Sequence, residues 1–112
     1  MSTTLDDLTS GAPMRPCGYA RYATQLTAEI DLDTDPTDGK RLSECNGKPN
    51  RAMFQCETQD VRWTDDSSIA LSATVGMLLK ANTVLEYEGD LSRITFIQVA
   101  ATAVLHVHYY NS

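Results

Sequence analysis

Apolar and polar residues alternate along most of the chain from Tyr19 onward. In the segment 26–32, apolar side chains occupy every second position and Thr27, Glu29 and Asp31 lie between them. The segment 103–110 repeats this arrangement. A period of two residues is typical of a strand with one buried face, and no segment has the 3.6-residue period of a convincing amphipathic helix. The pattern therefore predicts an almost entirely β protein.

Clusters of Asp, Gly, Pro, Asn and Ser separate the apolar runs and have the composition of tight turns. They lie at 35–39, 46–50, 64–68 and 88–90. The runs between them lie at 26–32, 41–44, 53–56, 61–63, 69–73, 77–79, 84–88, 94–99 and 103–110. About eight short antiparallel strands with turns every 8 to 12 residues or so predict a jelly-roll-like β-sandwich.

The chain has 112 residues, enough for one domain. Residues 1–18 are poor in large apolar side chains, and Pro13 and Pro16 favour an extended backbone. We expect residues 1–18 to form an extended N-terminal arm and residues 19–112 to form the β-sandwich. The part from Thr9 to Arg21 is expected to become ordered only against a neighbouring subunit. The alternative is a loose terminus without a partner.

Fifteen acidic and nine basic residues give a net charge of −6. This balance disfavours binding to nucleic acid or to an anionic membrane, because phosphate contacts need clustered cations. Five carboxylates fall within 29–38, and we expect them to face solvent, since burying them unpaired is too costly. The charge-free run 94–112 contains Thr, Gln, His and Asn, so it is a poor membrane span.

The three cysteines, Cys17, Cys45 and Cys56, are odd in number and form no CxxC motif. Free thiols in a reducing compartment therefore fit better than a disulfide framework. A nucleophilic pair of Cys56 with His108 remains open, because sequence does not fix spatial neighbours. The chain has no GxSxG, P-loop or GxGxxG motif, and we expect no enzyme activity.

His106 and His108 lie two residues apart on an expected strand, so both side chains point to one side. They could bind zinc, but no local motif supplies a third ligand, and two outward-facing polar residues are the simpler interpretation. The run from Asp31 to Asp35 resembles the start of a calcium loop. Pro36 and Leu42 then occupy the positions that require Gly and Glu. We expect neither a metal nor a cofactor.

The aromatic residues suggest two kinds of binding surface. Tyr and Trp rings could form a face that stacks on sugars, whereas Tyr together with Arg is favoured at protein interfaces. The candidate partner-contact residues are Met14, Arg15, Tyr19, Arg21 and Tyr22. The expected core contains Leu26, Ile30, Phe54, Trp63, Leu71, Leu85, Ile94, Phe96, Leu105 and Val107.

The second half of the chain resembles small virion proteins of tailed bacteriophages. The likeness lies in the runs Val75–Lys80, Val84–Leu91 and Ile94–Ile97 and in the ending Ala103–Tyr110. With the short length and the proline-containing N-terminal segment, the chain looks like a capsid decoration (cement or staple) protein of epsilon-fifteen-like short-tailed phages. The resemblance implies a jelly-roll-like structural protein, made in the host cytoplasm and placed on the outer capsid surface.

The resemblance to decoration proteins also implies the partners of this protein. Such proteins clamp neighbouring major capsid proteins and often pair with a second copy at two-fold positions. A carbohydrate- or receptor-binding module of a phage adsorption apparatus and a small metal-dependent β enzyme are the alternatives.

Overall fold

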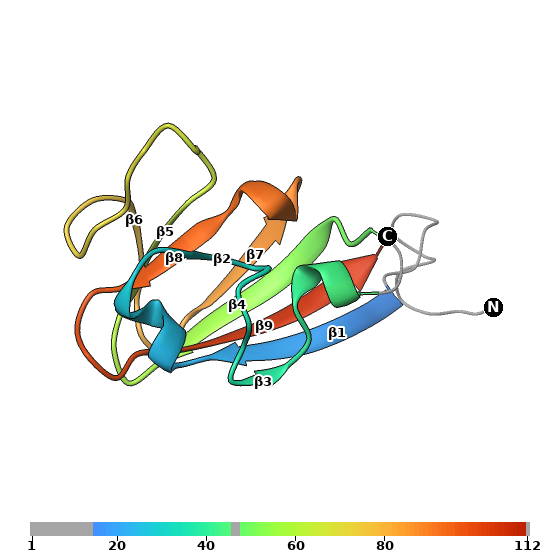
Figure 1. The fold of residues 1–112 in the computed structure, drawn as a ribbon, viewed down its shortest axis with the longest axis horizontal. Helices are drawn as coiled ribbons and strands as arrows, with labels where there is room; N and C mark the ends of the chain where they lie inside the picture. Colours follow the sequence, from blue (N-terminus) through green and yellow to red (C-terminus); the bar gives the residue numbers. More distant parts are fainter. Residues whose placement is uncertain (1–14, 46–47, 112) are drawn as a thin grey trace.

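The computed structural model describes residues 15–45 and 48–111 (Figure 1). Met14, one of the predicted contact residues, lies outside them. The described part is mostly β, with three short 3-10 helices. The strands are β1 Arg15–Tyr22, β2 Ile30–Asp31, β3 Asp38–Gly39, β4 Arg51–Glu57, β5 Val61–Thr64, β6 Met77–Leu79, β7 Val84–Glu88, β8 Thr95–Gln98 and β9 Val104–Asn111. The 3-10 helices are η1 Thr24–Thr27, η2 Leu42–Glu44 and η3 Leu91–Arg93.

Two antiparallel sheets form a sandwich. The five-stranded sheet has the order β3-β1-β9-β4-β7, and the four-stranded sheet has the order β2-β8-β5-β6. Figure 1 shows the long strands β1, β9 and β4 side by side, with β2, β8, β5 and β6 toward the other side of the molecule. This confirms the predicted all-β sandwich. Its assignment to the jelly-roll type stays a prediction.

The core lies between the inner faces of the two sheets. The Phe54 and Phe96 rings meet across the sandwich, with 4.9 Å between their centres. Of the expected core residues, Leu26, Ile30, Phe54, Leu71, Ile94, Phe96, Leu105 and Val107 are buried. Trp63 and Leu85 are half-buried and pack against this core. The core prediction is therefore confirmed for eight residues and partly confirmed for two.

Strand β9 is the central strand of the five-stranded sheet and pairs with β1 and β4. Its inward residues Leu105, Val107 and Tyr109 are fully buried. The residues between them point to the outer face, where they oppose outward residues of both neighbours. The alternation predicted for this segment is confirmed, and it separates a core face from an exposed face.

Three expected strands are wrong or shortened. Residues 24–27 form a 3-10 helix, and the strand expected over 26–32 is reduced to Ile30–Asp31. The 41–44 segment is also helical, and 69–73 lies in a loop with one isolated bridge, between Ser72 and Val75. Leu26 and Leu32 are buried all the same. Alternation here reflects burial of every second or third side chain, which a loop over the core achieves without strand pairing.

The start of the domain also differs from expectation. Arg15 to Gly18, assigned to the arm, are part of β1, which pairs with β9, so the sandwich begins within the expected arm. The ordering of Thr9–Arg21 by a neighbouring subunit stays a prediction. Cys17 and Cys45 form a disulfide with a Cα–Cα distance of 5.7 Å, so the expectation of three free thiols is wrong. The reason is spatial: a register shift between Pro16 and Gly18 places Cys17 beside the end of η2.

All five carboxylates of the acidic segment are exposed, as expected. They belong to Glu29, Asp31, Asp33, Asp35 and Asp38. Several shape the loop, since Asp31 Oδ1 accepts from the Asp33 backbone N–H at 2.9 Å and Asp33 Oδ1 accepts from Ser43 N–H at 2.7 Å. Across the described residues, no helix has the length and apolar character needed to cross a bilayer.

Candidate binding surface

The candidate site is the outer face of the five-stranded sheet, which no other described element covers. Pairing between strands brings three rows of side chains together across it. One row joins Tyr19, His108, Met53 and Glu86; the next joins Arg21, His106, Gln55 and Val84; and Tyr110, Arg51 and Glu88 form the third. We call these residues, together with Glu57, the sheet face. A shallow depression of about 430 Å³ lies over the first two rows.

A chain of hydrogen bonds crosses this surface. His106 Nδ1 lies 2.6 Å from the Tyr19 hydroxyl oxygen, and His106 Nε2 lies 2.5 Å from Glu57 Oε1. A carboxylate only accepts, so we assign the proton on Nε2 to the bond with Glu57. In the neutral imidazole, Nδ1 then accepts from the Tyr19 O–H. The network fixes the ring of His106 between β1 and β4.

The surroundings of Tyr19 favour its protonated hydroxyl. Burial raises the pKa of the Tyr19 hydroxyl above its usual value, the Asp38 and Glu57 carboxylates raise it further, and Arg21 opposes them. The bonds among Tyr19, His106 and Glu57 hold these three side chains in fixed positions on the sheet face.

Aromatic rings line the centre of the sheet face. The Tyr19 and His106 rings are stacked at 5.9 Å between centres with 20° between planes. The His108 ring lies 4.9 Å from Tyr19 and 6.4 Å from Tyr110. Four rings from two adjacent strands thus form a continuous aromatic row. Rings carry large contact area with few rotatable bonds, so they lose little entropy when a partner binds.

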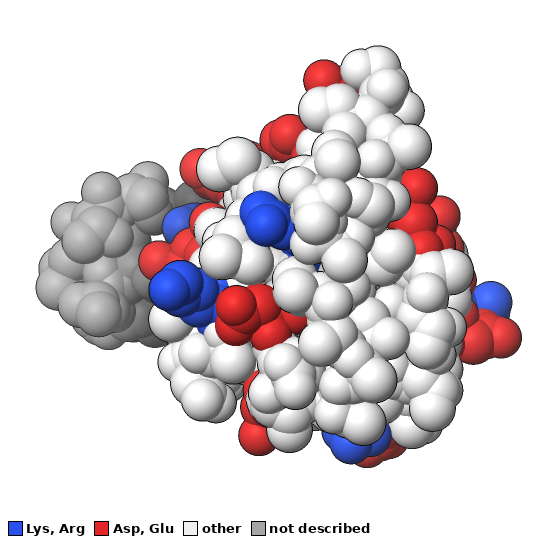
Figure 2. Space-filling model, turned by 90° about the vertical axis from the view of Figure 1, so that its left-hand side faces the viewer, with Lys and Arg blue, Asp and Glu red and all other residues white. Residues whose placement is uncertain are grey.

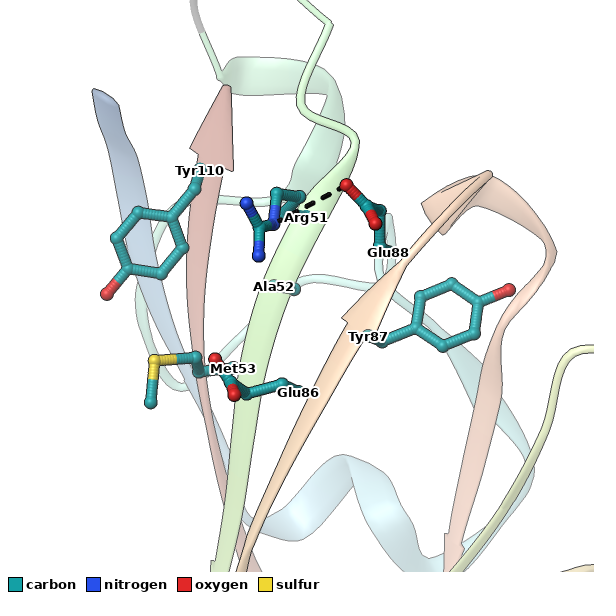
Figure 3. A pocket seen from close by; sticks show the side chains of 7 residues that line it. All are labelled: Arg51, Ala52, Met53, Glu86, Tyr87, Glu88 and Tyr110. Carbon is teal, nitrogen blue, oxygen red and sulfur yellow. Dashed lines mark ion pairs between the residues drawn. The ribbon is translucent and has the colours of Figure 1, made fainter. Parts of the chain in front are cut away.

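The upper end of the sheet face combines charge with apolar surface (Figure 3). Arg51 Nε lies 3.7 Å from Glu88 Oε2, an exposed ion pair that contributes little to stability. Glu86 and Met53 project beside each other below it, with Tyr110 on the other side of Arg51 (Figure 3). These residues line a second depression of about 220 Å³. A partner here would meet a positive group, two carboxylates and a thioether.

The predicted contact residues separate into two groups. Tyr19 and Arg21 point outward on β1 and belong to the sheet face, opposite His108 and His106. Arg15 is exposed at the start of β1. Tyr22 is fully buried, and its hydroxyl donates to the Leu32 carbonyl at 2.8 Å. The prediction that Tyr22 contacts a partner is therefore wrong, because the alternation of β1 turns it into the core.

Sequence analysis missed the residues that other strands contribute. Met53 and Glu57 come from β4, which is distant in sequence from Tyr19 and is joined to it only through β9. The outward position of His106 was predicted, but its bonds to Tyr19 and Glu57 depend on strand order. The useful signal was the alternation of β4, which places Met53, Gln55 and Glu57 on one side.

Two candidate chemistries can be compared with the positions of their residues. Cys56 is buried on the inner side of β4, and burial, with the Asp60 carboxylate, raises the pKa of its thiol to about 11. His108 points to the outer face, so a Cys56–His108 pair does not form. Within residues 15–45 and 48–111, no group of three or more His, Cys, Asp or Glu side chains is placed to hold a metal ion.

Comparison with known proteins gives no relative on which to base a function: no family model matches the chain, and neither a curated protein nor a solved structure matches it.

Proposed function

We propose that this protein binds the outer surface of a phage capsid and clamps neighbouring major capsid proteins. The bound protein would stabilise the shell against the pressure of the packaged DNA. The observation that carries the proposal is the sheet face, an open surface of rings, apolar groups and a few charges. Tyr, Met and Arg side chains of this kind are enriched at protein interfaces. The resemblance of the second half of the chain to decoration proteins selects the capsid as the partner.

The size of the sheet face sets what it can do alone. Strands β1, β4, β7 and β9 have five to eight residues each. At ~3.3 Å per residue and ~4.8 Å between strands, their outer face covers roughly 450 Å². A stable interface buries about 800 Å² of accessible surface per partner, and the accessible surface of protruding side chains exceeds the plan area of their strands. The proposed capsid contact would therefore use most or all of the sheet face.

Clamping adds avidity to a modest contact. When one rigid domain touches two capsid subunits, the second contact forms at high effective concentration. Because the protein would bind only the assembled lattice, its binding free energy adds to the stability of the shell. Pairing of two copies at a two-fold position would act in the same way. In this proposal the protein is made in the host cytoplasm and resides on the outside of the virion.

Sedimentation with purified capsids tests the proposal. The wild-type chain should pellet with capsids that have been stripped of decoration protein. Met53→Arg, which places a charge in the centre of the sheet face, should weaken binding about tenfold or more. Ala28→Arg is the matched control, because it adds the same charge at an exposed position outside the sheet face. Equal binding of the two variants, or no binding of the wild type, would refute the assignment.

The second candidate is a carbohydrate-binding module of an adsorption apparatus. The aromatic row of Tyr19, His106, His108 and Tyr110 favours it, since ring faces stack on sugars. Retention of the protein on immobilised host surface glycans measures this directly. If glycans retain the wild type but not Tyr110→Ala, and stripped capsids do not bind the protein, the carbohydrate function replaces the capsid function.

A further inference from the structure

The two ends of the sandwich differ in the chemistry of their side chains. At the end that carries the β5–β6 loop, acidic and basic side chains are scattered among uncharged ones (Figure 2). The opposite end, where β1 begins and β9 ends (Figure 1), holds the disulfide between Cys17 and Cys45. This bond joins the first part of β1 to the residue that ends η2. The sheet face makes no use of its redox chemistry.

The disulfide lies at an interruption of the ladder between β1 and β9. The register shifts between Pro16 and Gly18, so Cys17 occupies a bulge. Only Arg15 and Pro16 pair with β9 before the bulge, and both are exposed. Pro16 has no backbone N–H to donate to the ladder. Short and exposed strand ends of this kind open at little cost in free energy, so the disulfide is the contact that secures the start of β1.

Contacts that do not involve sulfur hold the surroundings of the disulfide in place. After the bulge, the Tyr19 carbonyl accepts from the Lys40 backbone N–H at 2.7 Å. At the start of η2, the Leu42 backbone N–H donates to the Leu32 carbonyl at 2.9 Å. These bonds tie the segment before Cys45 to β1 and to the loop after β2. Breaking the disulfide would therefore leave the two sulfur atoms near each other and the rest of the sandwich folded.

The three cysteines differ in their access to solvent. Cys17 is half-buried, Cys45 is buried with 6% of its surface accessible, and Cys56 is fully buried. The Cys56 thiol donates to the Leu79 carbonyl at 3.3 Å, and burial raises its pKa to about 11. Thiol–disulfide exchange requires a thiolate and access to the sulfur that is attacked. A small thiol in solution therefore reaches the sulfur of Cys17 first, and Cys56 takes no part in exchange.

We propose that Cys17 and Cys45 form a redox-sensitive latch, in which a small thiol such as glutathione reacts at Cys17 and releases the start of β1. In the first step, the thiolate of the small thiol attacks Cys17 Sγ. The bond between Cys17 and Cys45 breaks, and Cys45 leaves as a thiolate that takes a proton from water. A second small thiolate then attacks the small-thiol sulfur of the mixed disulfide and releases Cys17. The protein disulfide has gained two electrons, and the two small thiols have become a disulfide; the reverse steps close the latch.

The latch acts on one end of the sheet face. Pro16 pairs with Tyr110, whose ring ends the aromatic row, and Arg15 is a predicted contact residue. A closed latch orders this end before a partner binds, which lowers the entropy lost on binding. For the residues from Arg15 onward, the latch is an intramolecular alternative to ordering by a neighbouring subunit. Its effect on the affinity of the sheet face rests on the proposed function, whereas the latch itself does not.

Nuclear magnetic resonance relaxation of the full chain tests the latch without a capsid. Reduction with glutathione should lower the order parameter of the Arg15 backbone amide from about 0.85 to below about 0.6. The amides of Tyr22 and Leu105 are internal controls and should stay near about 0.85. A mobile Arg15 in the oxidised chain would overturn the proposal and favour ordering by a neighbouring subunit. Unchanged order at Arg15 after reduction, or loss of order at all three amides, would overturn it as well.

Two matched variants identify the sulfur at which exchange begins. In Cys45→Ser, the Cys17 thiolate should attack oxidised glutathione, release one glutathione and keep the other as a mixed disulfide. In Cys17→Ser, the remaining thiols are buried and should react at least about tenfold more slowly. Peptide mass mapping should place the adduct at Cys17, with none at Cys56. Equal rates in the two variants, or a faster reaction of Cys45, would overturn the proposal. Each of these outcomes is independent of whether capsids bind.

Discussion

Reduction of the Cys17–Cys45 disulfide should destabilise the domain by a predictable amount. The bond joins residues 28 apart in sequence, and the loop between them contains η1, β2, β3 and η2. In the chain-entropy model, a loop of this length lowers the entropy of the unfolded state by about 12 cal/mol/K, or about 3.6 kcal/mol at 25 °C. A domain of this kind has a total stability of about 5–15 kcal/mol, so the loss should be readily measurable.

Denaturant unfolding of the oxidised and the reduced chain measures this difference. Fluorescence of Trp63, the single tryptophan, reports unfolding because its ring packs edge-on against Tyr87, with 6.1 Å between the ring centres. The reduced chain should also have a larger m-value, since its unfolded state is less compact. The double variant with Ser at positions 17 and 45 is the control and should not respond to the reductant. A difference below about 0.5 kcal/mol between oxidised and reduced wild type would refute the reasoning.

Two further predictions concern the core. Leu105→Ala should lower the free energy of unfolding by about 2–5 kcal/mol, because Leu105 is fully buried on the central strand; denaturant titration checks this. Alkaline pH should destabilise the fold in part through Tyr22, whose pKa is raised to about 12, mainly by burial. In the unfolded state Tyr22 ionises near pH 10, whereas in the folded state it stays protonated up to a higher pH. The loss of stability caused by Tyr22 is therefore absent below pH 10 and grows as pH rises toward 12. Thermal unfolding of Tyr22→Phe should show a weaker alkaline decline, and an equal decline would contradict the assignment.

The sequence predicted best the strands from β4 onward, and the expected bounds of the edge strands β6 and β7 agree with the structure. β4 and β9 were placed within a few residues, and the two faces of β9 were assigned correctly, because a central strand must bury one whole face. The part of the chain before β4 was harder, and the beginning of β1 was assigned to the arm. Around Ile30, burial of Leu26 and Leu32 imitates the strand pattern, although only Ile30 and Asp31 pair with β8. The alternation of apolar and polar residues indicates which side chains are buried. Strand pairing depends in addition on which segments become neighbours in space.

The candidate site was predicted only in part for the same reason. Tyr19 and Arg21 were identified from residue type, but Tyr22 was included with them because neighbouring positions in a strand are indistinguishable until the inward face is known. The disulfide was missed because an odd number of cysteines argues for free thiols when partners are unknown. Cys45 follows a loop whose return toward β1 depends on the pairing of Ala20 with Gly39.

Gly39 illustrates how closely the fold and the sheet face are linked. Its φ is +95°, and a Cβ at this position would collide with the Tyr19 carbonyl oxygen. Only glycine therefore lets β3 approach β1 closely enough to pair and to bring Asp38 beside Arg21. The alternation that buries Ala20 is the one that turns Tyr19 outward toward His106. A one-residue slip of β1 would exchange these faces, so the forces that select the core register also assemble the proposed binding surface.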